Sequence, residues 1–186
     1  MRFIKSLLKN LLILIAVFAI LAFINRWYLG GFTKLIAQES NMGPYTMAYT
    51  GFVGEYGKVG PSMTKVYEVL SGAGIVSYTG AGIYYDDPVV ISGALLRSDI
   101  GAIIDTQDAK KLANNKNVKI TTIPAKNRIV VVFPLKNTFS YMIGPMKVYP
   151  VITKYMEERG YSHEVPMMEL YDMVAKKIYY MADISK

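Results

Sequence analysis

Glu169 and Tyr171 are the residues of this 186-residue chain whose types and spacing best suit the binding of an organic molecule. They stand two positions apart, and the alternation of a β-strand would place both side chains on one face of a sheet. An aromatic ring can stack on a flat molecule while a carboxylate meets its positive charge. The alternative is that such rings only fill the core and edge of a small sheet.

Further aromatic side chains in both halves of the chain are candidates for the same cleft. Tyr85 and Tyr171 each follow a predicted helix and each precede an aspartate, so we expect the two rings to face one another across a groove. The full set of predicted ligand-binding residues is Glu169, Tyr171, Tyr85, Tyr179, Phe52 and Tyr56.

Other kinds of chemistry find little material in the sequence. The absence of cysteine excludes disulfides, thiolate nucleophiles and cysteine metal sites. His163 is the one histidine and cannot build a histidine-rich metal site. Asp86, Asp87 and Asp99 suit turns and caps better than a divalent ion. We therefore expect no catalytic residue, no metal and no cofactor.

Two similar units of strand, helix, strand and strand should position the candidate residues. Period-two alternation and helical spacing of apolar residues define them. The first unit has strands at 45–52, 76–85 and 94–104, with a helix opening at Pro61-Ser62; the second has strands at 129–133, 166–173 and 177–183, with a helix at 148–159. The predicted fold is α+β: a mainly antiparallel sheet from this internal repeat, with two helices on one face and a cleft between the repeats.

The N-terminal residues do not suit a globular core. Leu11 to Ile24 contains no polar side chain, and residues 7–29 would be long enough to span a bilayer if Lys9 and Arg26 extend outward. The alternative is a cleavable signal peptide. We predict a single-pass membrane anchor at 1–28, a linker at 29–42 and a binding domain at 43–186.

Charge bears on topology and partners. Arg2, Lys5 and Lys9 precede the apolar run, which favours a cytoplasmic N-terminus and an extracytoplasmic domain. The net charge of +7 includes four basic residues and no acids in residues 1–28, so the rest of the chain is close to balanced. We therefore expect the lipid bilayer, but no nucleic acid, among its partners.

Four segments resemble the GyrI-like small-molecule-binding domain family. They are the loop 54–60, Ile83-Tyr-Tyr-Asp-Asp-Pro88 with Leu96-Arg97-Ser98, the helix 148–159, and Glu169-Leu-Tyr171. Within that family, Gly54–Gly57, Ile123-Pro124-Ala125, Val131–Pro134 and Tyr155–Arg159 are similar to the membrane-anchored branch typified by a testis-expressed receptor of endoplasmic-reticulum phagy.

The resemblance implies a membrane-anchored effector-binding protein that takes a small apolar or aromatic molecule, including a cationic one. Soluble members often carry an Ile-Glu pair on the last strand, whose glutamate is implicated in binding cationic drugs or in hydrolysis. Here that pair is Ile178-Tyr179, so we expect no enzyme activity. A protein-interaction module with a vestigial cleft is the second hypothesis, and a GyrI-like hydrolase is the third.

Overall fold

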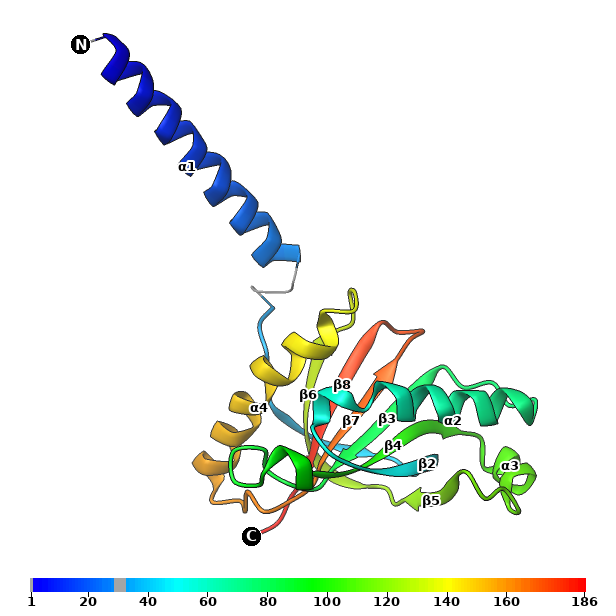
Figure 1. Ribbon diagram of the computed structural model, residues 1–186. Helices are drawn as coiled ribbons and strands as arrows, with labels where there is room; N and C mark the ends of the chain where they lie inside the picture. The colour runs from blue at the N-terminus through cyan, green and yellow to red at the C-terminus, as the bar shows by residue number, and fades with distance from the viewer. Residues whose placement is uncertain (1, 29–32) are drawn as a thin grey trace. The chain divides into compact units, whose positions relative to one another are not determined.

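The computed structural model describes residues 2–28 and 33–186, and the chain divides into two units, Met1–Lys34 and Leu35–Lys186. The first unit contains helix α1 (Arg2–Tyr28), drawn in blue in Figure 1. Its apolar side chains, such as Leu14 and Phe18, are exposed. Among the described residues, the structure contains no helix that meets the length and apolarity required to cross a membrane. The single-pass span predicted at 7–29 is therefore unsupported, and Leu29 lies outside the described residues.

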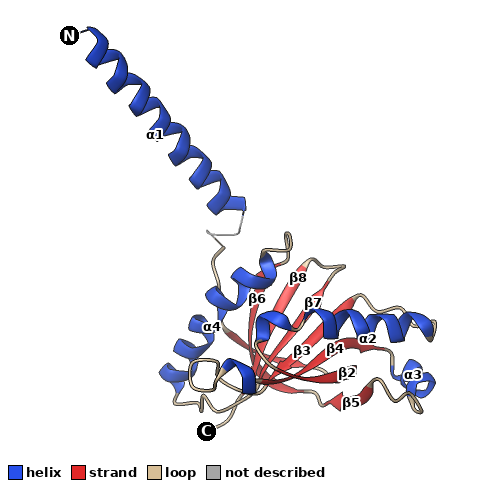
Figure 2. Cartoon of the chain, in the orientation of Figure 1, coloured by secondary structure: helices blue, strands red, loops and turns tan. Residues whose placement is uncertain are grey.

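The second unit is built on one sheet of eight strands, all paired antiparallel (Figure 2). Its order is β1-β6-β8-β7-β3-β4-β2-β5. The strands are β1 (Gln38–Met42), β2 (Tyr45–Val53), β3 (Thr79–Tyr84), β4 (Arg97–Ile104), β5 (Lys119–Ile123), β6 (Lys126–Pro134), β7 (Met167–Asp172) and β8 (Lys177–Asp183).

Helices and short turns connect these strands. Helix α2 (Gly60–Gly72) follows β2, and helix α4 (Ser140–Arg159) follows β6. The shorter pieces are η1 (Tyr56–Lys58), η2 (Gly93–Leu95), α3 (Thr106–Ala109) and η3 (Lys110–Leu112). The predicted repeat is therefore present as β2-α2-β3-β4 and β6-α4-β7-β8, and the α+β prediction is confirmed at that level.

The sheet order shows how the two repeats of the second unit combine. Strands β6-β8-β7 of one repeat mirror β2-β4-β3 of the other, so an approximate twofold axis runs between the central strands β7 and β3. Strands β1 and β5 extend the two ends by pairing with β6 and β2.

Both long helices of the second unit cover the same face of the sheet (Figure 1). On α4, Val148, Ile152 and Met156 pack against β6 and β8. On α2, Val66 and Leu70 pack against β2 and β4. The central strands β3 and β7 thus lie between the two helices. A third core, which includes Met47, Leu170 and Met181, occupies the opposite face.

Two predicted boundaries differ from the structure. The predicted linker 29–42 lies partly outside the described residues, and its last five residues form strand β1. Helix α4 starts at Ser140 rather than near Val148, with Pro145 and Pro150 inside it. Proline usually ends or kinks a helix, so Pro145 favoured a start after it, although Pro150 lies inside the predicted helix. The earlier start brings Tyr141 onto the helix.

Candidate functional site

Glu169 lies at the centre of the face that carries the two helices. It belongs to the middle of β7, where it pairs with Gly82 of β3 and Tyr180 of β8. Its side chain is almost completely covered, with 3% of the residue exposed. A carboxyl group this deeply buried needs hydrogen-bond donors, because an unpaired buried charge is strongly unfavourable.

Tyrosine hydroxyls supply those donors. The hydroxyl of Tyr149, from α4, donates a short hydrogen bond to Oε1 of Glu169, and the hydroxyl of Tyr171 donates to Oε2 at 2.7 Å. The hydroxyls of Tyr84 and Tyr171 are 2.9 Å apart and share a hydrogen bond. Tyr180 stands beside Glu169 in the register of β7 and β8. We call Tyr84, Tyr149, Tyr171 and Tyr180 the tyrosine cage.

Edge-to-face ring contacts hold the cage and extend it outward. The ring of Tyr149 meets that of Tyr180 with centroids 5.8 Å apart, and the ring of Tyr56 meets that of Tyr84 at 4.8 Å. Tyr141, 40% exposed on α4, contacts Tyr171 at 5.5 Å. Aromatic residues therefore fill the space between the helices and leave Glu169 covered.

Burial dominates the electrostatics of this cluster. It raises the pKa of Glu169 to about 7, against the lowering effect of the hydrogen bonds from Tyr149 and Tyr171. Burial, followed by the nearby Glu169 carboxylate, raises the pKa values of Tyr84 and Tyr149 well above their usual range. These tyrosines therefore remain neutral donors at neutral pH, while Glu169 can gain or lose a proton there.

Two buried hydroxyl groups of this face have no hydrogen-bond partner among the described residues. They are those of Tyr180 and Ser98. Ser98 on β4 pairs with Tyr84, so it lies near one end of the cage. The Tyr180 hydroxyl approaches Gly144 of α4 so closely that a Cβ atom there would overlap it. This position of α4 must therefore be glycine for Tyr180 to keep its place.

Four of the six predicted ligand-binding residues lie on the face of the cage. Glu169 and Tyr171 are inside it, and Tyr56 contacts it through Tyr84. Phe52 lies towards the end of β2, where it pairs with Ser98. The structure therefore brings Glu169, Tyr171 and Tyr56 together and keeps Phe52 on the same face.

The other two predicted residues, Tyr85 and Tyr179, lie on the opposite face. Tyr179 packs into the third core, with Leu170 beside it in the register. The Tyr85 hydroxyl donates to Oδ2 of Asp99 at 2.6 Å, away from the cage. This corrects the expected pairing of Tyr85 with Tyr171: successive side chains of a strand alternate between faces, so Tyr84 takes the expected place.

Three cage residues were not among the predicted ligand-binding residues: Tyr84, Tyr149 and Tyr180. Tyr84 and Tyr180 are each adjacent to a predicted residue: Tyr85 was chosen in place of Tyr84, and Tyr179 in place of Tyr180. Tyr149 lies on the helix predicted at 148–159, but none of the predicted ligand-binding residues came from a helix. A usable signal was Gly82, because a glycine at the centre of a strand often marks a close approach of another group; the ring of Tyr84 lies over it.

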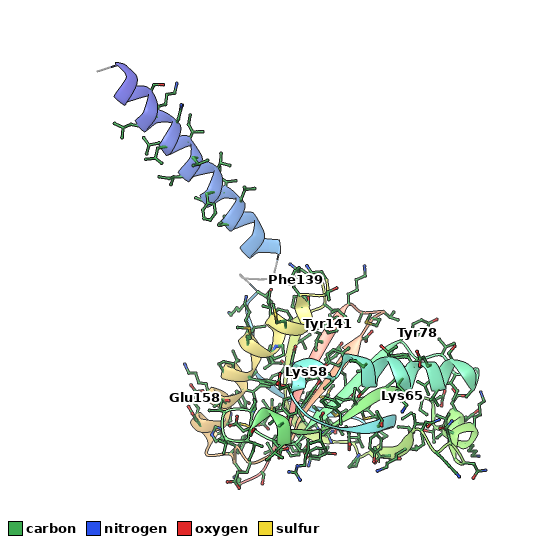
Figure 3. The ribbon with its side chains drawn as sticks, in the orientation of Figure 1. Lys58, Lys65, Tyr78, Phe139, Tyr141 and Glu158 are labelled. Atoms are coloured by element: carbon green, nitrogen blue, oxygen red, sulfur yellow. The ribbon has the colours of Figure 1, made fainter. Side chains whose placement is uncertain are left out.

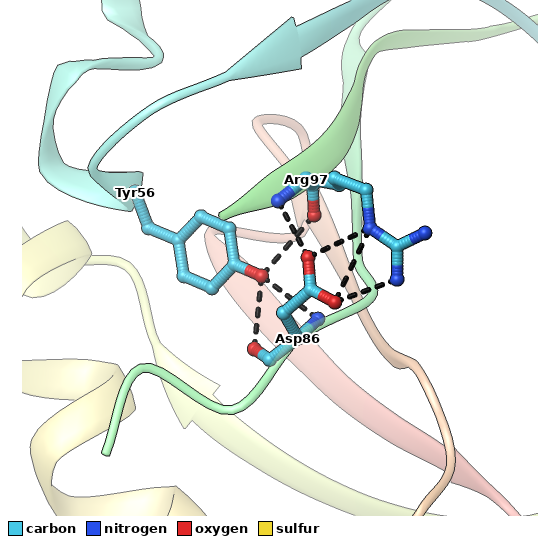
Figure 4. Close-up of polar contacts among 3 residues, drawn as sticks. All are labelled: Tyr56, Asp86 and Arg97. Atoms are coloured by element: carbon cyan, nitrogen blue, oxygen red, sulfur yellow. Dashed lines mark hydrogen bonds and ion pairs between the residues drawn. The ribbon is translucent and has the colours of Figure 1, made fainter. Parts of the chain in front are cut away.

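The Asp-Asp-Pro turn has a structural role beside the cage (Figure 4). Asp86 accepts hydrogen bonds from the backbone N–H and the guanidinium of Arg97, with Nη2 and Oδ1 2.7 Å apart. The Tyr56 hydroxyl donates to the backbone oxygens of Asp86 and Arg97 at 2.9 and 3.1 Å. The arginine lowers the pKa of Asp86. This arrangement fixes the ring of Tyr56 against Tyr84.

Comparisons with known proteins identify the fold. No family model matches the sequence, and no curated protein matches it. EcmrR in a cryo-EM complex with DNA is similar over 100% of this chain and 72% of its own, with a TM-score of 0.57 and 14% identity. The EcmrR C-terminal domain matches 82% of this chain and 98% of its own, with a TM-score of 0.57 and 14% identity.

An uncharacterized conserved protein from Listeria innocua has a TM-score of 0.50 and 12% identity, over 80% of this chain and 92% of its own. At such identities the likeness is one of fold. These structures support the GyrI-like fold that the sequence motifs resemble, and they offer no support for its membrane-anchored branch. The second unit of this chain has a GyrI-like fold.

Proposed function

We propose that the unit Leu35–Lys186 binds a small, flat, cationic or aromatic molecule at Glu169. The observation that carries the proposal is a buried carboxyl group, held by tyrosine hydroxyls, in the middle of the face between α2 and α4. The resemblance of the motifs to small-molecule-binding domains, together with the shared fold, agrees with it.

The chemistry of the cage suits a delocalised cation. Its positive charge would stabilise the ionised form of Glu169, and the neutral tyrosines would offer ring faces and edges for stacking. Because Glu169 is covered, a ligand must displace part of the cage. Tyr149 and Tyr141 come from α4 rather than from the sheet, so a shift at the start of this helix would open the site.

A matched pair of probes tests the proposal. N-methylquinolinium is a permanent aromatic cation, and 1-methylnaphthalene is its neutral counterpart. We expect Glu169→Gln to weaken binding of the cation about tenfold or more, since a charge-assisted contact is lost, and to change binding of the neutral probe much less. Glu158→Gln, a change at an exposed carboxylate of α4, is the control. If Glu169→Gln left the affinity for each probe the same as in the unmodified protein, the proposal would be contradicted.

A protein-interaction module is the second candidate function. The observation in its favour is that the protein's own rings occupy the cage, as expected of a vestigial cleft. If neither probe binds at millimolar concentration, this second reading replaces the first.

We propose that the chain is not an enzyme, on a ground different from the last-strand substitution. Position 179 faces away from the cage, so Tyr179 does not decide the matter. A pKa near 7 would suit Glu169 to general acid–base catalysis, but the other cage members are neutral tyrosines and offer it no acid–base partner. Turnover of p-nitrophenyl acetate that Glu169→Gln abolishes would contradict this.

Membrane attachment, with the second unit outside the cytoplasm, also remains a proposal. Its support is the exposed apolar surface of α1, including Leu12, Leu14 and Phe18. Recovery of the chain in the pellet after alkaline extraction of membranes would support attachment, and its release into the supernatant would contradict it. We make no proposal of nucleic-acid binding.

A further inference from the structure

A second feature of the Leu35–Lys186 unit is an exposed apolar surface at the start of α4. Phe139, Met142 and Met146 follow one another at helical spacing and are 58%, 60% and 73% exposed. The turn between β7 and β8 adds Met173 and Val174, at 50% and 73%. We call these five residues, with Tyr141, the α4 patch (Figure 3 labels Phe139 and Tyr141).

Contacts between the two segments make the α4 patch continuous. The Tyr141 hydroxyl lies 3.6 Å from the sulfur of Met173. The N–H of Leu135, just before the α4 segment, donates to the carbonyl of Lys176 at 2.9 Å. The start of α4 and the β7–β8 turn therefore lie side by side at one end of the sheet.

The two segments that form the α4 patch carry charges of one sign. Its segments carry Lys136, Lys147, Lys176 and Lys177, and residues 134–150 and 173–178 contain no aspartate or glutamate. The acid that borders them is Asp172, whose carboxylate accepts hydrogen bonds from the N–H groups of Val174 and Ala175. Apolar side chains set among lysines form a surface that suits an anionic, partly apolar partner.

The exposed loop between β3 and β4 provides a contrast within the same unit. Val89 and Val90 are 91% and 76% exposed, and they follow Asp86, which pairs with Arg97, and Asp87. Glu55, which pairs with Lys58, lies close to Gly93 of the same loop. This loop also exposes apolar side chains, but acids and bases of opposite sign lie together around it. Apolar exposure alone therefore does not distinguish the two surfaces, whereas charge does.

We infer that the α4 patch docks on the surface of an anionic phospholipid bilayer. Phe139, Met142 and Met146 share one face of the helix and can enter the boundary between head groups and acyl chains. Each lysine near an anionic surface strengthens the attraction about fivefold. The inference depends neither on a membrane span in α1 nor on ligand binding at Glu169.

The test uses the full chain and its lack of cysteine. A single cysteine introduced as Met146→Cys carries a polarity-sensitive fluorophore, which reports whether the α4 patch itself enters lipid even if α1 also binds. The matched control is Val89→Cys with the same label. Each protein is mixed with phosphatidylcholine vesicles and with vesicles of 70% phosphatidylcholine and 30% phosphatidylserine.

We expect a blue shift of the label at position 146 with the anionic vesicles only, and none at position 89. The double variant Lys176→Asn/Lys177→Gln should raise the lipid concentration needed for half of the shift about 10- to 30-fold. Asparagine is chosen because Lys176 has a positive φ of 53°, which asparagine tolerates. The inference fails if the label at position 146 shows no blue shift with anionic vesicles, or if the labels at 146 and 89 shift equally. It also fails if the shift depends neither on phosphatidylserine nor on Lys176 and Lys177.

Discussion

Glu169 is the residue at which burial and hydrogen bonding act in opposite directions. Burial favours the neutral acid, whereas the donors Tyr149 and Tyr171 favour the carboxylate, and burial has the larger effect. The result is a group that changes charge near neutral pH inside the protein. A bound cation would shift the balance to the carboxylate, so ligand affinity should increase as the pH rises through about 7.

The same shift makes the free protein less stable as the pH rises. The pKa of Glu169 is about 7 in the folded state, against an ordinary value of 4.5. Between these values the folded state holds the proton that the unfolded state has released. The free energy of unfolding should therefore fall between pH 4.5 and 7, by on the order of 3 kcal/mol. Urea unfolding at several pH values measures it, and Glu169→Gln should remove this part of the slope. An unchanged slope in the variant would show that other groups cause it.

The effect of the cage hydrogen bonds on the pKa of Glu169 should be separable from the effect of burial. Tyr171→Phe removes a donor to the carboxylate, so we expect the pKa of Glu169 to rise further. Tyr85→Phe is the matched control, because this hydroxyl donates to Asp99 on the other face. NMR titration of the labelled glutamate carboxyl carbon measures both. If Tyr85→Phe changed the pKa of Glu169 more than Tyr171→Phe does, the pairing of Tyr85 with Tyr171 expected from the sequence would be supported instead.

The sequence placed Glu169 and Tyr171 on one face of the sheet but did not include Tyr84, Tyr149 and Tyr180, which lie around them. The Glu169–Tyr171 spacing gave the correct face, because period two holds within one strand. The consecutive tyrosines 84–85 and 179–180 place one ring on each face, and the sequence does not say which face carries the helices. That depends on where the strands begin and on what α2 and α4 cover.

At the scale of elements, α4 determines whether the cage is closed. It contributes Tyr149 to Glu169 and lays Gly144 over the hydroxyl of Tyr180. The sequence predicted the second half of this helix, at 148–159. The first half was not predicted, because proline rarely lies inside a helix. Here the helix continues through Pro145 where it packs on the sheet.

The contact between Gly144 and Tyr180 can be tested by a double-mutant cycle. Alanine usually stabilises a helix relative to glycine, but here Gly144→Ala should destabilise by about 1–3 kcal/mol, because the new methyl group overlaps the Tyr180 hydroxyl. Tyr180→Phe alone should cost little, since that hydroxyl has no partner among the described residues. The double variant should recover most of the loss. Additive effects of the two changes would refute the contact.

At the scale of the whole second unit, the twofold relation explains the position of the site. Gly82 and Glu169 face one another across the central strand pair, and Tyr84 and Tyr171 each stand two residues further along their strands. An axis at the Gly82–Glu169 pair therefore relates the two tyrosines whose hydroxyls meet. The internal repeat was evident from the sequence because both copies of it share the same element order. The position of the axis was not, because it depends on strand register.

The second unit should fold without α1. All three cores lie between residues 47 and 182, and the residues beside them begin at Leu35. A chain starting at Leu35 should therefore unfold cooperatively, with a Tm within about 2 °C of the full chain, because it keeps all three cores.

A chain starting at Gly43 is the informative control for that truncation. It loses β1 and with it the Met42 carbonyl, which accepts a 2.6 Å hydrogen bond from the buried guanidinium of Arg128. The guanidinium keeps Asp183 and the Pro124 carbonyl as partners, but loss of one buried hydrogen bond from a charged donor costs about 1.5–3 kcal/mol. In a domain of this size each kcal/mol lowers the Tm by about 2–4 °C. We expect a Tm lower by about 5–10 °C, followed by circular dichroism. If the truncation at Leu35 were as damaging as the truncation at Gly43, the stability of the second unit would depend on α1.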